Sequence, residues 1–274
     1  MTPSGHGGSL TGTTAFVSGS SRGIGRVVAL ALAESGCSVA VHGRSASTAG
    51  EVAAELAREG KHAGTFLGDL SQAGGAAQLA DEVLAALPAL DIFVAVAGAD
   101  VLTGPAAHHS FEQKLESLLT VDVLGTITMA RRIGAAMHAR GRGAIVTIGW
   151  DQAEVGMEGD SGQLFAATKG AVMAFTRSLA RSLGPAVRVN TVAPGWIRTA
   201  WGEQASEVWQ RRARREAMLG RWGEPADVAA AVTWLVSPEA SWVTGQVLPV
   251  NGGFRRAPFP EARAVEHSDR GTPS

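Results

Sequence analysis

The 274-residue chain contains no tyrosine, a single cysteine and no apolar run long enough to cross a bilayer. Without tyrosine, no proton transfer in this protein can run through a phenol hydroxyl. The lone Cys37 excludes an internal disulfide framework and suits a reducing cytosol. Residues 1–10 also lack the apolar stretch of a signal peptide, so we expect a cytoplasmic protein with no membrane partner. The net charge of −1 gives no reason to expect a nucleic-acid partner.

The chain is 45% hydrophobic and 18% charged, which provides enough apolar material for one large core. Between polar, Gly-rich ends, short apolar runs alternate with segments that carry Ala and Leu at helical spacing. The expected strands are residues 15–17, 39–41, 65–67, 92–96, 144–148, 187–192 and 247–250. The expected helices are residues 24–34, 49–59, 75–87, 111–139, 163–183 and 226–236.

This alternation predicts an α/β fold, a doubly wound parallel sheet (Rossmann fold) with helices on both faces in three layers. We expect a single domain over residues 11–254, with a lid near residues 197–220. Residues 1–10 and 255–274 are expected to be flexible segments, because they lack periodicity and are rich in small, polar or charged residues.

The most specific motif is a glycine-rich run that follows the first expected strand and opens the first expected helix. It reads Ser18-Gly19-Ser20-Ser21-Arg22-Gly23-Ile24-Gly25. Glycines there let the backbone turn sharply and approach a pyrophosphate at the positive end of a helix. Arg44, with Ser45 after it, ends the second strand, where an acidic residue would hold a ribose hydroxyl and an arginine suits a 2′-phosphate. The pattern favours NADP(H), with NAD(H) as the weaker alternative.

With these motifs, residues 10–254 resemble the short-chain dehydrogenases/reductases, in particular their 3-oxoacyl-acyl-carrier-protein reductases. The glycine motif, Asp69 in Gly-Asp-Leu, the Pro194–Thr199 stretch and the closing 244–246 and 251–253 segments match that family. The family's Asn-Asn-Ala-Gly motif survives only as Ala97-Gly98 after two apolar residues. The resemblance and the glycine-rich loop together imply these cofactor-binding residues: Ser18, Gly19, Ser21, Arg22, Gly23, Ile24, Gly25, Arg44, Ser45, Asp69, Leu70, Ala97, Gly98, Lys169, Pro194, Gly195, Ile197 and Thr199.

The catalytic positions depart from the family pattern. In the family a Tyr, a Lys, a Ser and an Asn cooperate, and only Lys169 is retained here. Phe165 stands at the Tyr place, Trp150 at the Ser place and Asp122 at the Asn place. Losing a positioned acid or base forfeits about 10²- to 10⁴-fold in rate. Hydride transfer itself needs only the cofactor and orientation, so a slower reductase remains open.

Two carboxylates are candidates for the missing proton source. Asp151 is nearest to the lost Ser, and desolvation there would raise its pKa. Asp122 could form an ion pair with Lys169, a pair that is as plausibly structural as catalytic. The other acidic residues of the 150–161 loop are interpreted as solvated, and no metal site is predicted, since His108-His109 has no matching ligands nearby.

Tryptophans are expected to shape the substrate pocket. Trp150, Trp196, Trp201 and Trp209 fall on segments that border the family's pocket, and with Phe165 they predict a flat, apolar or aromatic substrate. The alternative is that some of them only pack the lid helix. Trp222, Trp234 and Trp242 are interpreted as ordinary core or surface packing. The basic run in residues 211–215 is interpreted as a solvated helix face, or else as a docking patch for a phosphate-bearing carrier.

Three functions therefore stay open. The first is an atypical NADP(H)-dependent oxidoreductase acting on a carbonyl or alcohol of an apolar small molecule, free or carrier-bound. The second is a non-redox cyclase, isomerase or dehydratase on the same scaffold, and the third is a catalytically silent NADP(H)-binding protein. By the family resemblance, helices 111–139 and 163–183 imply a homodimer or homotetramer.

Overall fold

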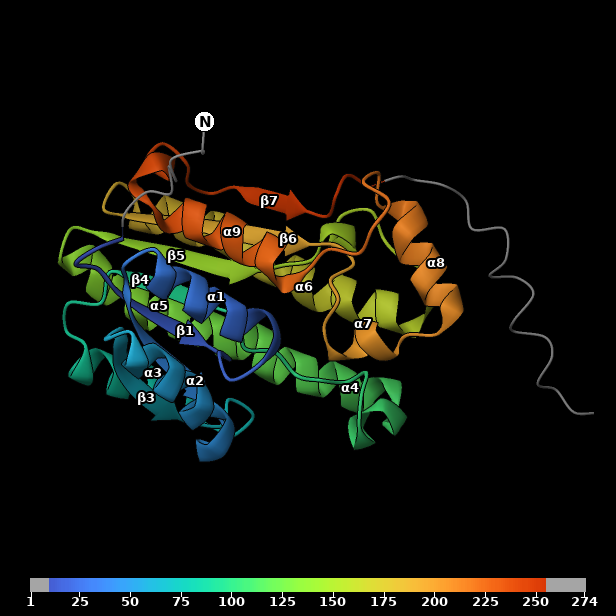
Figure 1. Cartoon of the computed structure of the whole chain (residues 1–274), viewed down its shortest axis with the longest axis horizontal. Coiled ribbons are helices and arrows are strands. Elements are labelled where there is room, and N and C mark those ends of the chain that lie inside the picture. The colour runs from blue at the N-terminus through green and yellow to red at the C-terminus, as the bar shows by residue number, and fades with distance from the viewer. Residues whose placement is uncertain (1–9, 255–274) are drawn as a thin grey trace, which may run out of the picture.

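A seven-stranded, wholly parallel sheet forms the centre of the molecule in the computed structural model, which describes residues 10–254. The strand order is β3-β2-β1-β4-β5-β6-β7, which reverses direction between β1 and β4. The strands are β1 (Thr14–Ser18), β2 (Ser38–Gly43), β3 (His62–Leu67), β4 (Ile92–Ala95), β5 (Gly143–Ile148), β6 (Val187–Pro194) and β7 (Val247–Val250). Their carboxyl ends point towards the end of the molecule where the helices α4, α7 and α8 lie (Figure 1).

Helices cover both faces of this sheet. They are α1 (Gly23–Glu34), α2 (Ala46–Arg58), α3 (Gly75–Ala86), α4 (Phe111–Leu118), α5 (Thr126–Ala139), α6 (Gly159–Leu183), α7 (Ala200–Gln204), α8 (Glu207–Glu216) and α9 (Pro225–Val236). Short helical turns are η1 (Pro105–His108), η3 (Asp151–Ala153) and η4 (Pro238–Ala240), and η2 (Leu119–Gly125) is π-helical. No helix within residues 10–254 is long and apolar enough to cross a membrane.

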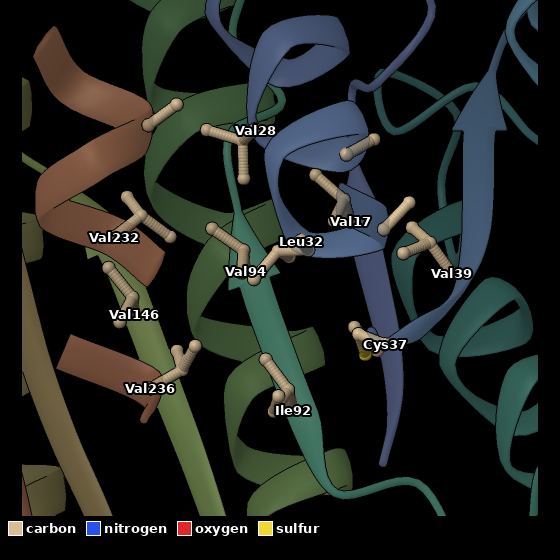
Figure 2. Close-up of a cluster of buried hydrophobic side chains, with 14 of the residues drawn as sticks. Val17, Val28, Leu32, Cys37, Val39, Ile92, Val94, Val146, Val232 and Val236 are labelled. Atoms are coloured by element: carbon tan, nitrogen blue, oxygen red, sulfur yellow. The ribbon is translucent and has the colours of Figure 1, made fainter. Parts of the chain in front are cut away.

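The two faces of the sheet make two separate cores because side chains alternate along each strand. In β1, Val17 faces a core shared with α1, α2 and α9, whereas Phe16 faces the core of α3, α5 and α6. Figure 2 shows Val17 and Val94 from the strands meeting Val28 of α1 in the first core. The five inner strands β1, β2, β4, β5 and β6 therefore have apolar cover on both sides, which explains why their apolar runs in the sequence are nearly continuous, whereas the edge strands β3 and β7 are partly exposed.

The doubly wound fold predicted from the sequence is confirmed, and each predicted strand is present. The predicted helix 111–139 differs, because α4 and α5 are separated by the π-helical turn η2. The lid predicted near residues 197–220 contains α7 and α8. The two terminal segments predicted to be flexible lie outside the described residues except for Leu10, which is buried and donates its backbone N–H to Ser35.

Candidate functional site

A cleft of about 1400 Å³ opens at the carboxyl ends of the strands, where the strand order reverses. This is the place where open α/β sheets bind ligands. The cleft, called the main cleft below, takes its walls from every loop that follows β1 to β6 and from the lid. Its lining includes Gly19, Ser21, Arg22, Gly23, Ile24, Gly25, Arg44, Ser45, Asp69, Leu70, Ala97, Gly98, Asp122, Trp150, Phe165, Lys169, Pro194, Gly195, Trp196, Ile197, Thr199 and Trp201.

The glycine-rich loop fits a dinucleotide because its backbone turns tightly at positions 19 and 25, where a side chain would clash. Gly19 has φ +67°, and a Cβ there would lie 2.6 Å from the Cα of Ala97. A Cβ on Gly25 would lie 2.2 Å from the carbonyl oxygen of Gly19. Gly23 has φ +55° and no atom near its missing Cβ, so it opens α1 with bare backbone towards the cleft. The loop and the first turn of α1 thus form a cradle suited to a pyrophosphate.

A buried histidine that the sequence analysis missed supports this loop. His42 of β2 accepts a hydrogen bond at Nδ1 from the backbone N–H of Gly19, at 3.0 Å. Its Nε2 lies 3.1 Å from the carbonyl oxygen of Gly68, so Nε2 carries the proton and the ring is neutral. Burial lowers the pKa of His42, which keeps both bonds in place near neutral pH. The sequence did contain a sign of this role, because His42 is a polar residue near the end of the otherwise apolar strand β2.

Arg44 and Asp69 line the main cleft just after β2 and β3. Arg44 is exposed, lines the cleft and forms no ion pair with any residue that the structure describes. Its guanidinium is therefore available to a phosphate. Hydrogen bonds from the backbone and hydroxyl of Ser71 lower the pKa of Asp69. The carboxylate is thus charged and held in place beside the cleft.

Ser18 was predicted to contact the cofactor, and the structure corrects this prediction. Ser18 is buried and does not line the main cleft. Its Oγ instead accepts hydrogen bonds from the backbone N–H groups of Val96 and Ala97, at 3.2 and 3.3 Å. The loop after β4 lacks the amide side chains usual in the family, and Ser18 ties this loop to β1.

The predicted ion pair between Asp122 and Lys169 is present. Asp122 is 2% exposed, and its Oδ2 lies 2.7 Å from Nζ of Lys169, which is 15% exposed and faces the cleft. Its Oδ1 accepts a hydrogen bond from the backbone N–H of Ala99, at 2.7 Å. Asp122 belongs to the π-helical turn η2, a type of turn often found at functional sites. One carboxylate thus joins α6 to the loop that follows β4.

Trp150 and Phe165 lie together in the part of the main cleft next to Lys169. Their rings meet edge to face, with centroids 6.2 Å apart and planes at 63°. Neither ring can give or take a proton. Ser161, one turn before Phe165 on α6, also lines the cleft, as do His109 and Glu116 at its edge. No sequence motif marks these three polar residues as part of the cleft, and His109 was considered only as a metal ligand.

Asp151, the other predicted proton source, does not line the main cleft. Its Oδ2 accepts a hydrogen bond from Nδ2 of Asn251 at 3.0 Å, and its Oδ1 is buried with no partner among the described residues. Burial raises the pKa of Asp151 to about 6, as the sequence analysis anticipated. The side chain packs behind Gly195, because a Cβ on that glycine would lie 3.1 Å from Oδ2. Asp151 thus lies against Gly195, outside the lining of the main cleft.

Four tryptophans build the wall of the main cleft under the lid. Trp196, Trp201 and Trp209 line it as predicted, and Trp222 packs against Trp196 and Trp201 as a buried side chain, in agreement with its predicted core packing. The ring centroids of Trp196 and Trp209 are 5.5 Å apart, and those of Trp196 and Trp201 are 6.2 Å apart. Trp234 and Trp242, by contrast, are exposed. The cluster gives this end of the cleft a large apolar surface made of rings that are mostly tilted relative to one another.

Arg212 corrects the interpretation of residues 211–215 as a solvated helix face. Its side chain is 8% exposed, and it forms ion pairs with Glu158 and Glu216, at 2.6 and 2.7 Å. Its guanidinium also lies over Trp209, 5.1 Å from the ring centroid. Glu216 accepts a hydrogen bond from Nε1 of Trp196 at 2.8 Å. These contacts fasten α8 to the tryptophan cluster and to the start of α6, and Glu158 is not merely solvated.

Taken together, the parallel sheet and the glycine cradle define a dinucleotide-binding α/β protein. A family model described as enoyl-(acyl carrier protein) reductase matches residues 19–255. The chain is 34% identical to the 3-oxoacyl-[acyl-carrier-protein] reductase of Aquifex aeolicus (strain VF5) over 89% of this chain and 98% of the relative. It is also 34% identical to the cyclohexanol dehydrogenase of Rhodococcus sp. (strain TK6) over 89% and 97% of the two chains.

The structures agree with this relationship. The 3-oxoacyl (acyl-carrier-protein) reductase of Agrobacterium tumefaciens C58, solved with NADP bound, superposes with a TM-score of 0.80 at 32% identity, over 90% of this chain and 95% of that one. The protein belongs to the short-chain dehydrogenase/reductase family of oxidoreductases, as the sequence motifs predicted. Within residues 10–254 no group of three or more His, Cys, Asp or Glu side chains is arranged to hold a metal ion.

Proposed function

We propose that the protein is an NADP(H)-dependent oxidoreductase that acts on a carbonyl or alcohol group of an apolar, ring-containing small molecule. The observation that carries this proposal is the Lys169–Asp122 pair, which faces one continuous cleft with the glycine cradle at one end and the tryptophan wall at the other. Relatives that act on acyl-carrier-protein-linked and cyclic alcohol substrates support the reaction class.

The cofactor preference follows from the side chains at the end of β2. The cradle of Gly19, Gly23 and Gly25 would hold the pyrophosphate, and Arg44 with Ser45 would hold a 2′-phosphate. Lys169 would hold the nicotinamide ribose. An acidic residue at the end of β2 would favour the free ribose 2′-hydroxyl of NAD(H). This chain has Arg44 there instead, which supports NADP(H). Bound there, the cofactor would supply or accept the hydride.

Side chains of the protein would transfer the proton to or from the substrate oxygen. Phe165 and Trp150 carry no acid or base, and Asp151 lies behind Gly195, so the route runs through the Asp122–Lys169 pair. Both oxygens of Asp122 are occupied by Lys169 and by the N–H of Ala99, so the transferable proton of the pair lies on Nζ of Lys169. The carboxylate of Asp122 holds Nζ in place at 2.7 Å, and Nζ would donate to a carbonyl oxygen directly or through one water.

Single-turnover mixing tests this function. Protein loaded with NADPH is mixed with a panel of cyclic and aryl ketones, and the nicotinamide absorbance is followed with time. We expect a slow loss of absorbance that falls by about 10²-fold or more in Lys169→Gln, since a positioned acid is removed. Gln163→Ala, an exposed position on α6 that does not line the cleft, is the matched control.

One observation favours a second function. The rings of Trp150 and Phe165 occupy the places of the family's two hydroxyl residues and contact each other. A protein that binds NADPH but oxidises it with no ketone of the panel, even at high protein concentration, would be a cofactor-binding protein without catalysis. Substrate conversion without a change in nicotinamide absorbance would instead indicate non-redox chemistry.

We also propose that the protein forms a homo-oligomer. Leu119 and Leu124 of the turn between α4 and α5 are 40% and 59% exposed, on the segment for which the family resemblance implies a subunit interface. Light scattering of the purified protein measures the mass directly, and a monomer at micromolar concentration contradicts the proposal.

A further inference from the structure

A second cavity of about 630 Å³ adjoins the main cleft beneath the lid. One wall comes from the segment after β4, including the turn η1, and the other comes from α7. Its lining residues, which define the second cavity, are Leu102, Thr103, Gly104, Pro105, Ala107, His108, Trp201 and Gln204. None of the residues expected to bind the cofactor is among them, so this space is separate from the nucleotide site.

Leu102 and Trp201 line both cavities, so their side chains form the boundary between them. On the main-cleft side, Trp201 stacks on Trp196 with the ring planes 26° apart. Trp201 therefore presents one part of its surface to the tryptophan wall and another to the second cavity. A molecule lying on that wall needs only to extend past Leu102 and Trp201 to reach the second cavity.

The chemistry of the second cavity differs from that of the tryptophan wall. Its polar lining side chains are Thr103, His108 and Gln204, and it has no lysine, arginine or carboxylate in its lining. Within residues 10–254 the side chains of His108 and Gln204 make no hydrogen bond, so both can donate and accept. The hydroxyl of Thr103 donates to the carboxylate of Asp100, which leaves its oxygen free to accept.

We propose that the second cavity binds the far end of an elongated substrate, and that this end is an uncharged hydrogen-bonding group such as an amide or hydroxyl. This inference rests on the proposed function for the reacting end, which lies in the main cleft beside Lys169. The apolar middle of the substrate lies on Trp196 and Trp201, and its end group reaches His108 and Gln204. No lysine or arginine lines the second cavity, which favours an uncharged end group over an anionic one. Two cations beside it already have partners: Lys114 donates to the carbonyl oxygen of Ala107, and Arg22 pairs with Asp100.

Calorimetric titration with three matched ketones tests the inference. The probes are 2-acetylnaphthalene, its 6-carboxylic acid, and the N-(2-hydroxyethyl) amide of that acid, each titrated with and without NADP⁺. We expect the amide probe to bind about tenfold more tightly than 2-acetylnaphthalene, and the acid to show no such gain. Gln204→Ala and His108→Ala should each weaken the amide probe about three- to tenfold, the effect of one neutral hydrogen bond, and leave 2-acetylnaphthalene unchanged. Gln163→Ala is the control, since Gln163 is also exposed but lines neither cavity.

Each outcome of these titrations tests binding in the second cavity separately from the proposed oxidoreductase function. If the amide probe binds more tightly than 2-acetylnaphthalene but no ketone is reduced, the inference about the second cavity is supported and the oxidoreductase proposal fails. Equal affinity of the amide probe and 2-acetylnaphthalene overturns the inference, as does a preference for the acid or the failure of all three probes to bind. The inference also fails if Gln204→Ala weakens both neutral probes alike while its melting temperature matches that of the wild type, since the residue would then act on the main cleft.

Discussion

The buried ion pair between Asp122 and Lys169 should contribute far more to stability than an exposed pair of the same length. At 2.7 Å, two unit charges attract by about 6 kcal/mol at an effective dielectric constant near 20, and by about 1.5 kcal/mol in water. Asp122 is 2% exposed, so the first figure applies before the loss of hydration is subtracted. We expect a net coupling of about 2 to 3 kcal/mol between the two side chains.

The chain offers a matched control for this coupling. Arg132 and Asp81 are also 2.7 Å apart, but their side chains are 47% and 58% exposed. Exposed pairs contribute about 0.2 to 1 kcal/mol. A double-mutant cycle with Asp122→Asn and Lys169→Gln, compared with a cycle on Arg132 and Asp81, separates pair energy from the effects of each single change.

Urea unfolding of each variant supplies the free energies for both cycles. Asp122→Asn alone should lower the free energy of unfolding by about 3 kcal/mol, because Lys169 is left facing an amide donor in a largely dry site. In a chain of this size that loss corresponds to a melting temperature about 6 to 12 °C lower. A coupling energy for Asp122 and Lys169 no larger than that of Arg132 and Asp81 would refute the reasoning, and the pair would then be solvated in solution.

Three further predictions concern the surroundings of the cleft. Burial gives Asp151 a pKa of about 6, above its value in the unfolded chain, so its contribution to stability is present at low pH and lost as the pH rises through 6. At pH 8, Asp151→Asn should therefore have a free energy of unfolding on the order of 2 kcal/mol higher than the wild type, measured by urea denaturation, and no such advantage near pH 4. An equal difference at both pH values contradicts the assignment. Because the pKa of His42 is lowered, its stabilising contribution is present above the ordinary histidine pKa and lost as the pH falls below it. His42→Leu should lower the free energy of unfolding at pH 8 by about 1 to 3 kcal/mol and weaken NADPH binding, since the N–H of Gly19 loses its acceptor; unchanged NADPH affinity by calorimetry would disprove the support role. Arg212 reaches Glu216 through Nε and Glu158 through Nη1, and Arg212→Lys replaces this fork by a single ammonium. Limited proteolysis should therefore cut α8 faster than in the wild type, and an unchanged cleavage rate would show that the ion pairs do not hold the lid.

The fold and the cofactor end of the site follow closely from the sequence because their determinants are local. The strand at Thr14–Ser18 is apolar on both faces, the glycines follow it directly, and Arg44 follows the next strand. Each feature needs only neighbouring residues to be recognised. The predicted strands match the observed 7-stranded sheet because they were recognised from local sequence patterns. At positions 19 and 25 a Cβ would clash with the neighbouring backbone, which explains why glycine is needed there.

The catalytic end of the site depends on contacts between distant segments, which a pattern does not reveal. Asp151 and Asp122 look equivalent in the sequence, yet one lies behind Gly195 and the other faces Lys169. The π-helical turn that carries Asp122 lies between two helical segments, and no sequence pattern separates its hydrogen bonding from that of an α-helix, so the sequence predicts residues 119–125 as part of one helix. Arg212 did leave a signal, since Trp209 and Glu216 stand three and four residues away on the same helix face.

The most direct test of the account is a pair of calorimetric titrations, with NADPH and with NADH, on the wild type and on Arg44→Ala. Arg58→Ala, an exposed arginine of α2 outside the cleft, is the control. We predict that the wild type and the control bind NADPH at least about tenfold more tightly than NADH, and that Arg44→Ala loses this preference, because one charge-assisted bond contributes about 1.5 to 3 kcal/mol. Equal affinity of the wild type for both nucleotides would contradict the assignment of Arg44, and the absence of binding to either would contradict the account as a whole.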